Sequence, residues 1–398
     1  MYDLFRGVRV IEVASWVFVP SAGAVLADWG ADVIKVEQPD TGDPLRGLEN
    51  GLVLRGGGSA MYETSNRGKR SIGIDLTSAE GREVLGDLIR SADVFLTNLR
   101  KRARDMLGLG SDEVRAHNSR IIYALGTGYG SRGSDADKPA FDAAASWARA
   151  GIAAQMADET GTPPMVPGSI GDLVAGLSLA AGVAAALMKR ERGGDATEVE
   201  ASLLSAGMWL MAQSITAEQG PGLPARRELA NNPLSLPYRT RDGQWIQLAM
   251  LQSDRAWSDL CRRLGAQYLA SDPRFATAER RRHNHSACIA ALGEVFAGKD
   301  ASHWLQALNG IDGIWDLVQA PREVRCDAQA LANGYLPEVE RPDGNTYRAV
   351  ASPVQFGGEQ LGAITAAPAH GAHTEDLLLE LGYSWDRIGS LKDTGAIL

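Results

Sequence analysis

The sequence is poor in cysteine, with only three among its 398 residues. Cys261, Cys288 and Cys326 are widely spaced, so they predict neither a disulfide framework nor a cysteine-based metal site. Residues 1–13 lack the charged start, the apolar run and the small-residue cleavage site of a secretory signal. Both absences lead us to expect a protein of the reducing cytoplasm.

Positive charge is also scarce, because 40 Lys and Arg residues stand against 49 Asp and Glu, which gives a net charge of −9. A general nucleic-acid-binding protein needs a basic face, so we expect no nucleic-acid partner. The longest nearly apolar stretch, residues 173–188, is shorter than the roughly 20 residues that cross a bilayer. It predicts a buried helix, and we expect no membrane partner. A few grouped cations would still suffice for a small anionic ligand.

Glycine-rich nucleotide motifs and metal motifs are missing as well. Residues 14–20, which follow the first predicted strand, contain no glycine, and the glycines at 126–130 lead into a polar segment. A dinucleotide fingerprint needs its glycines between a strand and a helix, so nicotinamide binding is not expected. His283 and His285 lie in a basic run that indicates a solvated face, since further ligands are missing nearby. We therefore expect no metal site.

Strand-like and helix-like segments alternate over the first 125 residues. Short runs rich in β-branched residues occur at 8–13, 32–37, 71–75, 93–97 and 120–125, and helical periodicity covers 21–29 and 77–90. Strands separated by helical crossovers predict a parallel, Rossmann-like sheet. The expected fold class is therefore α/β.

The remainder of the chain has a mainly helical pattern. Helices are predicted at 141–156, 171–192 and 196–215, and the Pro- and Gly-containing residues 221–237 resemble a linker. Two β-rich runs around Asp242 and Gly243 indicate a hairpin. A helical region to about residue 320 would form a smaller domain. A short β stretch at 349–356 and a terminal helix after Pro368 are expected to follow it.

Two features could carry chemistry. Asp172 opens the Ala-rich helix, where it would stabilise the helix by about 1 kcal/mol as an N-cap. Alternatively, a helix N-terminus could keep a functional carboxylate ionised in an apolar pocket. The spacing by itself favours the cap. The basic cluster Arg100–Arg104 follows the carboxyl end of a predicted strand, where an open α/β sheet binds ligands. A phosphate site and a solvated helix start are equally good interpretations of that cluster.

Seven segments together resemble the class III CoA-transferases, the family that also contains the α-methylacyl-CoA racemases. These segments are residues 7–46, 66–76, 92–110, 121–130, 141–151, 168–194 and 371–388. The resemblance implies a Rossmann-like large domain plus a small α+β domain, with two ring-shaped chains interlocked as a homodimer. Residues 1–220 and a return segment, 326–398, would form the large domain. Residues 221–237 would be the linker and residues 238–325 the small domain.

Within this resemblance, Asp172 takes the place of the family's nucleophilic aspartate. Its carboxylate would attack an acyl-CoA and then carry CoA as an aspartyl-CoA thioester until a carboxylic acid accepts it. Covalent catalysis of this kind needs no tightly bound cofactor, because coenzyme A arrives as part of the substrate. The residues at CoA-lining positions are Val17, Ile74, Asn98, Leu99, Ala103 and Lys138, with Arg102 and Arg104 in the segment that usually meets the phosphates.

Three departures from the family pattern bear on the reaction. Gln38 stands where an arginine often follows the glutamate of the second strand. Phe141 occupies the position of the racemases' catalytic histidine, and a phenyl ring cannot move a proton, so a transferase is favoured. Residues 228–234 replace a run of glycines that formyl- and oxalate-using transferases carry. A racemase-type epimerase and a non-catalytic CoA-ester-binding protein are the alternatives.

Aromatic residues near these segments are candidates for an acyl-binding pocket. The candidates are Trp16, Phe18, Phe141, Trp147 and the stretch 231–238. They hint at an apolar or aromatic acyl group, although aromatic residues at such spacings more commonly belong to a core.

Overall fold

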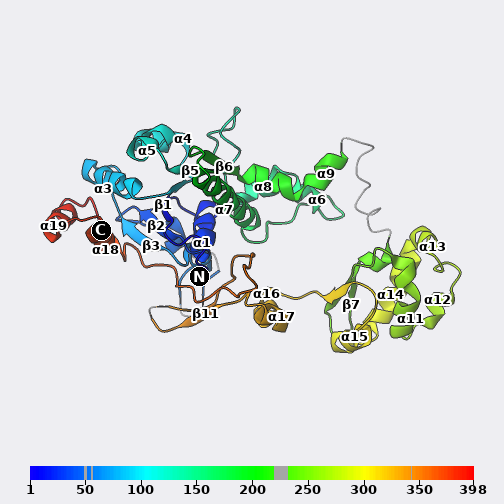
Figure 1. Ribbon diagram of the computed structural model, residues 1–398. Helices are drawn as coiled ribbons and strands as arrows, with labels where there is room; N and C mark the ends of the chain where they lie inside the picture. The colour runs from blue at the N-terminus through cyan, green and yellow to red at the C-terminus, as the bar shows by residue number, and fades with distance from the viewer. Residues whose placement is uncertain (49–51, 55–56, 219–231, 342) are drawn as a thin grey trace. The chain divides into compact units, whose positions relative to one another are not determined.

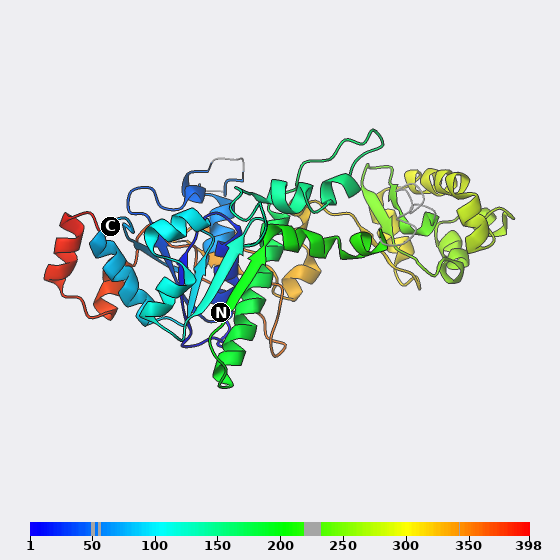
Figure 2. The same cartoon turned by 90° about the horizontal axis from the view of Figure 1, so that it is seen from above.

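The computed structural model describes residues 1–48, 52–54, 57–218, 232–341 and 343–398 (Figures 1 and 2). The chain divides into two compact units, the first formed by Met1–Ile215 and Asp327–Leu398, the second by Thr216–Cys326. Most of the predicted linker, residues 221–231, lies outside the described residues. Its last residues form the short 3-10 helix η3 (Pro233–Ser235) and the start of a strand at Pro237.

A six-stranded parallel sheet forms the centre of the first unit, and its first five strands correspond to the predicted β-rich runs. Its order is β3-β2-β1-β4-β5-β6, with Val10 of β1 opposite Val33 of β2 and Val94 of β4. The strands are β1 (Arg9–Val13), β2 (Asp32–Glu37), β3 (Arg70–Gly73), β4 (Val94–Thr97), β5 (Ile122–Thr127) and β6 (Glu198–Ser202). Strand order reverses between β1 and β4, and ligands of open α/β sheets bind at such a switch point, outside the carboxyl ends of the strands.

The prediction of a helix over residues 196–215 is wrong for its first part, residues 196–202. Residues Glu198–Ser202 form β6, which pairs in parallel with β5. Helix α8 (Leu203–Leu210) follows directly, and its N-cap is Ser202, whose hydroxyl accepts the N–H of Ser205. Within β6, Glu198 and Glu200 are exposed while Val199 and Ala201 are half-buried. Hydrogen bonding to the neighbouring strand therefore overrides the helical preference of the Ala and Glu residues.

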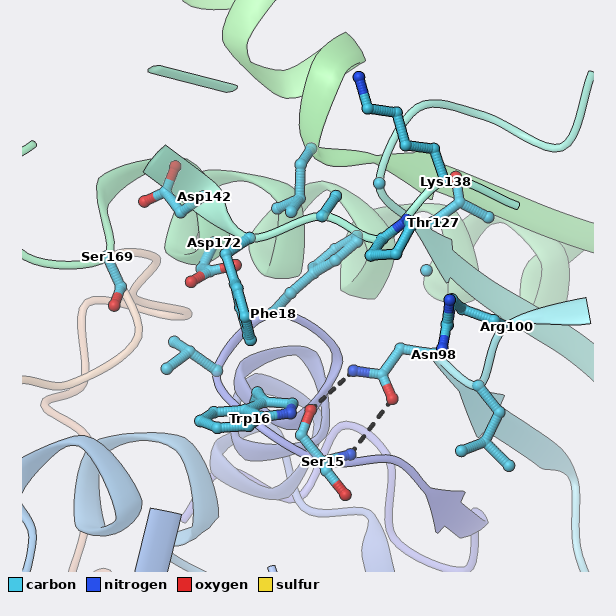
Figure 3. A pocket seen from close by; sticks show the side chains of 18 of the residues that line it. Ser15, Trp16, Phe18, Asn98, Arg100, Thr127, Lys138, Asp142, Ser169 and Asp172 are labelled. Atoms are coloured by element: carbon cyan, nitrogen blue, oxygen red, sulfur yellow. Dashed lines mark hydrogen bonds between the residues drawn. The ribbon is translucent and has the colours of Figure 1, made fainter. Parts of the chain in front are cut away.

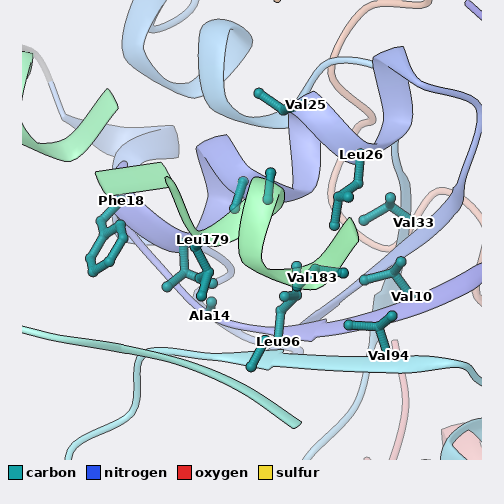
Figure 4. Close-up of a cluster of buried hydrophobic side chains, with 14 of the residues drawn as sticks. Val10, Ala14, Phe18, Val25, Leu26, Val33, Val94, Leu96, Leu179 and Val183 are labelled. Carbon is teal, nitrogen blue, oxygen red and sulfur yellow. The ribbon is translucent and has the colours of Figure 1, made fainter. Parts of the chain in front are cut away.

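Helices cover both faces of this sheet, and side chains alternate between the faces along each strand. Val10 and Val94 belong to the core under α1 (Phe18–Asp28) and α7 (Ile170–Glu191), whereas Ile11 and Phe95 belong to the opposite core. Figure 4 shows side chains of α1, α7 and the strands meeting in the first core. The second core is covered by α3 (Ala79–Arg90), α5 (Ser111–His117), α18 (Thr374–Glu380) and α19 (Trp385–Asp393). The terminal helix predicted after Pro368 is thus present as two helices.

Close contact between α1 and α7 depends on a glycine. A Cβ at Gly176 would overlap the Ser21 hydroxyl and would lie 2.7 Å from the carbonyl oxygen of Phe18. Helix α7 is the one helix among the described residues that is long and apolar enough to cross a membrane. Its residues Leu179 and Val183 are fully buried against the sheet and α1, so this part of the apolar run belongs to the core.

Shorter elements complete the first unit. They are η1 (Pro44–Gly47), α2 (Ala60–Asn66), α4 (Lys101–Leu107), the π-helical turn η2 (Ala143–Ala148), α6 (Ile152–Gln155), α9 (Ala212–Ala217, which reaches the second unit), α17 (Ala328–Ala332), β10 (Glu338–Glu340) and β11 (Thr346–Arg348). The β stretch expected at 349–356 is wrong, because the antiparallel pair β10–β11 precedes it and these residues form no strand. In the described part of the chain no strand pairs with residues 349–356, so their local β-propensity does not produce a strand.

The second unit has a core of its own. Strands β7 (Pro237–Arg239), β8 (Trp245–Leu248) and β9 (Trp315–Leu317) form an antiparallel sheet, and β7–β8 confirms the hairpin predicted around Asp242 and Gly243. The helices of this unit are α11 (Ser253–Arg263), α12 (Gln267–Ser271), α13 (Ala278–His283), α14 (His285–Ala297), α15 (Ala301–Leu308) and α16 (Pro321–Val324). Leu234 and Tyr238, two residues of the predicted acyl-binding stretch, are buried in this core.

Candidate functional site

A pocket of about 900 Å³ opens at the switch point of the sheet. Its lining comes from residues 15–18 after β1, from the segment 98–104 after β4, from the segment 126–143 after β5, and from residues 166–172 at the start of α7. Figure 3 shows side chains of these segments around one space. This volume lies at the upper end of the range for small-molecule sites.

Asp172 lies in the first turn of α7 and lines this pocket. Gly168 adopts a left-handed backbone with φ of +71°, which turns the chain into the helix without the strain that another residue would have there. The N-cap is Ser169, and Asp172 is the third helical residue. The cap interpretation of Asp172 is therefore wrong, and its carboxylate faces the pocket instead.

A second carboxylate, that of Asp142, belongs to the same site. Its Oδ2 accepts the backbone N–H of Gly171 at 3.0 Å, and its Oδ1 accepts the Ser146 hydroxyl. A Cβ at residue 171 would overlap both of these partners, so only glycine fits between them. Asp142 is 6% exposed and lines the pocket beside Asp172 (Figure 3).

Burial and this neighbour change the acidity of Asp172. Burial is the larger cause and the negative charge of Asp142 the smaller, and together they raise the pKa of Asp172 from 3.8 to about 7. A carboxylate with a pKa near neutrality is more basic than an ordinary one and is still about half ionised at pH 7. The pair is therefore suited to nucleophilic or acid–base chemistry.

Trp16, in the loop after β1, has a left-handed backbone with φ of +70°, which no other non-glycine residue in the described part of the chain shares. Such a conformation costs a bulky residue about 1–3 kcal/mol and persists only where its surroundings enforce it. Asn98 clamps the preceding residue, donating to the Ser15 carbonyl at 2.7 Å and accepting the Ser15 N–H at 3.2 Å. The N–H of Trp16 itself donates to Asp43 Oδ1 at 3.4 Å.

Buried charged side chains also hold the loop after β1 in place. The Lys35 ammonium pairs with Asp43 at 2.8 Å and donates to the carbonyl of Ala14 at 2.9 Å. It also pairs with Glu12, which in turn pairs with Lys69, and all three of these side chains are fully buried. The loop that presents Trp16 is therefore fixed by a charged network inside the unit.

The structure brings most of the residues expected for CoA into one place. Those that line the pocket are Val17, Asn98, Leu99, Ala103, Arg104 and Lys138, together with Asp172. Arg104 donates to the Tyr123 hydroxyl at 3.1 Å, which orients its guanidinium. Arg102 is exposed and does not contribute to the lining, whereas Arg100 and Lys101 do. Ile74 lines a separate pocket of about 200 Å³ that shares Ser15 and Leu99 with the first.

The aromatic candidates divide in a similar way. Trp16, Phe18 and Phe141 line the pocket, and the rings of Trp16 and Phe141 meet edge-to-face with centroids 5.1 Å apart. Trp147 is 9% exposed, donates to the Pro164 carbonyl at 3.0 Å and does not line the pocket.

Sequence reasoning missed Asp142 as a site residue and Asp43 as a support of the loop. Asp142 precedes Asp172 by 30 positions, and no local periodicity connects the two. A signal was present in the dipeptide of Phe141 and Asp142, where the aspartate follows the position used to separate transferases from racemases. In the described part of the chain, no three His, Cys, Asp or Glu side chains are grouped as a metal ion would require.

Comparison with known proteins identifies the class to which this fold and site belong. The sequence model described as CoA-transferase family III matches residues 5–374. The chain therefore belongs to CoA-transferase family III, and it is a CoA-transferase.

Individual relatives agree with this assignment. The chain is 33% identical to the (R)-2-hydroxy-4-methylpentanoate CoA-transferase of Clostridioides difficile, over 99% of each chain. It is 32% identical to the cinnamoyl-CoA:phenyllactate CoA-transferase of Clostridium sporogenes, over 98% of this chain and 96% of that one. The crystal structure of a CAIB/BAIF family protein from Brucella suis superposes with a TM-score of 0.85 at 27% identity, covering 96% of this chain and 100% of the other. The last match confirms the α/β fold with its parallel sheet.

Proposed function

We propose that the protein is an acyl-CoA:carboxylate CoA-transferase that carries CoA as a thioester on Asp172. The observation that supports this most directly is a half-buried carboxylate with a pKa of about 7 at the start of α7, facing a pocket whose other side carries Arg100 and Lys138 (Figure 3). The cations suit the phosphates of CoA, and the carboxylate suits attack on the thioester.

The first half of the proposed reaction proceeds in two bond exchanges. A carboxylate oxygen of Asp172 attacks the thioester carbonyl carbon, the C–S bond breaks, and a mixed anhydride and CoA thiolate result. The thiolate then attacks the carbonyl carbon of Asp172 and breaks the anhydride C–O bond. The donor acid leaves as its carboxylate, and CoA remains bound to Asp172 as a thioester.

The second half reverses these steps with a different acid. The acceptor carboxylate attacks the aspartyl thioester, and CoA thiolate leaves as a new mixed anhydride forms. The thiolate attacks the acyl carbon of the acceptor, which releases the new acyl-CoA and restores the Asp172 carboxylate. No net proton is transferred, so the site needs a nucleophile and a water-poor pocket more than a general acid.

Covalent trapping tests this mechanism. The full-length protein is incubated with an acyl-CoA, quenched with hydroxylamine, and digested for mass spectrometry. We expect a hydroxamate on Asp172, and neither the adduct nor turnover in Asp172→Asn. A modification at another residue, or full transfer activity in Asp172→Asn, would contradict the mechanism.

The two alternative functions predict different results in the same assays. An epimerase would exchange the α-proton of its acyl-CoA with deuterated water in the absence of any acceptor acid. Phe141 stands where such an enzyme needs a base, and its ring has no titratable group. A non-catalytic CoA-ester-binding protein would bind CoA without forming an adduct.

We also propose that the protein acts as an interlocked homodimer in the cytoplasm. Exposed apolar side chains on α8 support an association surface, with Trp209 at 76% and Leu210 at 47% exposure. Light scattering after size exclusion should give about twice 42.4 kDa, and Trp209→Asp should lower that mass.

The free thiols of Cys261, Cys288 and Cys326 are in keeping with a reducing compartment, and fractionation of the host cell tests the location.

A further inference from the structure

Trp16 combines a strained backbone with an indole ring that is 36% exposed and lines the pocket. Hydrogen bonds from Asn98 to Ser15 and from Trp16 to Asp43 hold this backbone in place. Strain that the surroundings enforce collects at sites of function, and here its effect is to present a large apolar ring to the space beside Asp172.

Phe141 extends this apolar surface. Phe141 is 60% exposed, and its ring meets that of Trp16 edge-to-face with centroids 5.1 Å apart. Phe141 directly precedes Asp142, whose carboxylate holds the N–H of Gly171, the residue before Asp172. The two rings are therefore linked through a short chain of contacts to the turn that carries the nucleophile.

Charge separates the two sides of the pocket. In Figure 3, Asp142, Asp172 and Trp16 lie on one side, and Asn98 and Arg100 lie on the other. The cations suit the phosphates of CoA, and the thioester carbonyl must reach Asp172. The rings of Trp16 and Phe141 line the same pocket and are therefore available to contact the acyl group. A second carboxylate on that acyl group would meet the two rings and the negative charge of Asp142, which lines the same pocket.

We infer that Trp16 is a specificity-determining residue, which together with Phe141 forms an acyl-binding wall that selects monocarboxylic acids with an aromatic or branched apolar group. This inference rests on the proposed transfer through Asp172 and specifies its substrate class. Dicarboxylic acids are disfavoured by the same wall, because the negative charge of Asp142 repels a second carboxylate and aromatic rings replace its hydration poorly.

The test uses the first half-reaction, which requires no acceptor acid. The rate of adduct formation on Asp172 is measured in single turnovers with four donors: 3-phenylpropanoyl-CoA, 4-methylpentanoyl-CoA, acetyl-CoA and succinyl-CoA. In the unmodified protein we expect the first two to react at least about 100-fold faster than succinyl-CoA, a ratio within the reach of apolar and charge selection.

Two variants then locate the selectivity. Trp16→Gly removes the ring and accepts the left-handed backbone without strain, so the loop can keep its path. We expect it to slow the phenyl and branched donors by about 10- to 100-fold while acetyl-CoA changes by less than about 3-fold, because only the larger groups contact the wall. Phe141→Ala should act in the same direction, and the double variant should lose less than the product of the two single effects, because the rings touch.

The control is Trp385→Ala, which removes an indole that is 61% exposed on α19 and does not line the pocket. It should leave all four rates unchanged. The inference is overturned if succinyl-CoA reacts as fast as the phenyl donor, or if Trp16→Gly slows all four donors equally, as a merely structural role would. If no donor forms an adduct with the unmodified protein, the proposed transfer itself fails and takes this inference with it.

Discussion

The backbone N–H of Gly171 donates to Oδ2 of Asp142 at 3.0 Å, and this hydrogen bond joins the π-helical turn after β5 to the first turn of α7. Because a Cβ at residue 171 would overlap Asp142 and Ser146, the approach of the two segments requires glycine. This hydrogen bond places the carboxylate of Asp142 beside Gly171, the residue that precedes Asp172. The acidity of Asp172 therefore depends on a contact between residues 29 positions apart.

The first prediction concerns the pH dependence of the reaction. Asp172 must be deprotonated to attack, and its pKa is about 7, so the single-turnover rate of adduct formation should rise with pH and level off above about 8. Asp142→Asn removes the negative charge, while its amide oxygen can still accept from Gly171. We expect the midpoint of this variant to move to lower pH by up to about one unit.

Asp343→Asn, in the exposed turn between β10 and β11, is the matched control and should leave the midpoint in place. An unchanged midpoint in Asp142→Asn would show that burial accounts for the whole pKa shift.

The second prediction concerns stability, and its sign follows from linkage. The folded state raises the pKa of Asp172 above 3.8, so folding favours the protonated form. The free energy of unfolding should then decrease as pH rises from about 4 to about 7, relative to a variant that cannot ionise. We expect Asp172→Asn to be more stable than the unmodified protein by about 1–3 kcal/mol at pH 8 and nearly equal to it at pH 4. Urea unfolding at both pH values measures this, and an equal difference at the two would refute it.

The third prediction compares two helix-interior glycines. Gly176→Ala adds a methyl group that would overlap Ser21, so it should destabilise the protein by about 1–3 kcal/mol. A Cβ at Gly293 in α14 would meet nothing within 4 Å, so Gly293→Ala should stabilise by about 0.5–1 kcal/mol. Thermal unfolding distinguishes them, and a stable Gly176→Ala would mean that α1 and α7 can separate without loss.

The fourth prediction compares two arginines of one basic segment. Arg100 lines the pocket and Arg102 does not. We expect Arg100→Ala to raise the Kd for CoA by about 5- to 20-fold, and Arg102→Ala by less than about 2-fold. At ordinary ionic strength salt screens distant charges, so only a cation near the phosphates attracts them strongly. Calorimetry at two salt concentrations tests this, since the Arg100 effect should shrink as salt increases. Equal effects of the two changes would contradict the pocket geometry.

Local patterns were sufficient to predict much of the fold. The strand at 32–37 and the hairpin around Gly243 follow directly from periodicity and turn chemistry. Strand β6 could not be predicted in this way, because Glu and Ala residues favour a helix until β5 offers a hydrogen-bonding edge. The sequence also could not show which arginine of the basic segment lines the pocket, because that depends on the direction of the short helix α4.

The sequence by itself determined the alternation of strands and helices, the α/β class, and Asp172 as the residue of chief interest, because these depend on patterns within about ten residues or on recognisable segments. Only the tertiary structure decided that Asp142 is its neighbour, that Arg102 lies outside the pocket, and that Trp16 adopts a left-handed backbone. Each of these depends on loops that follow different strands and meet at one edge of the sheet. Contacts between such loops are fixed by strand order and packing, which no single segment of the sequence contains.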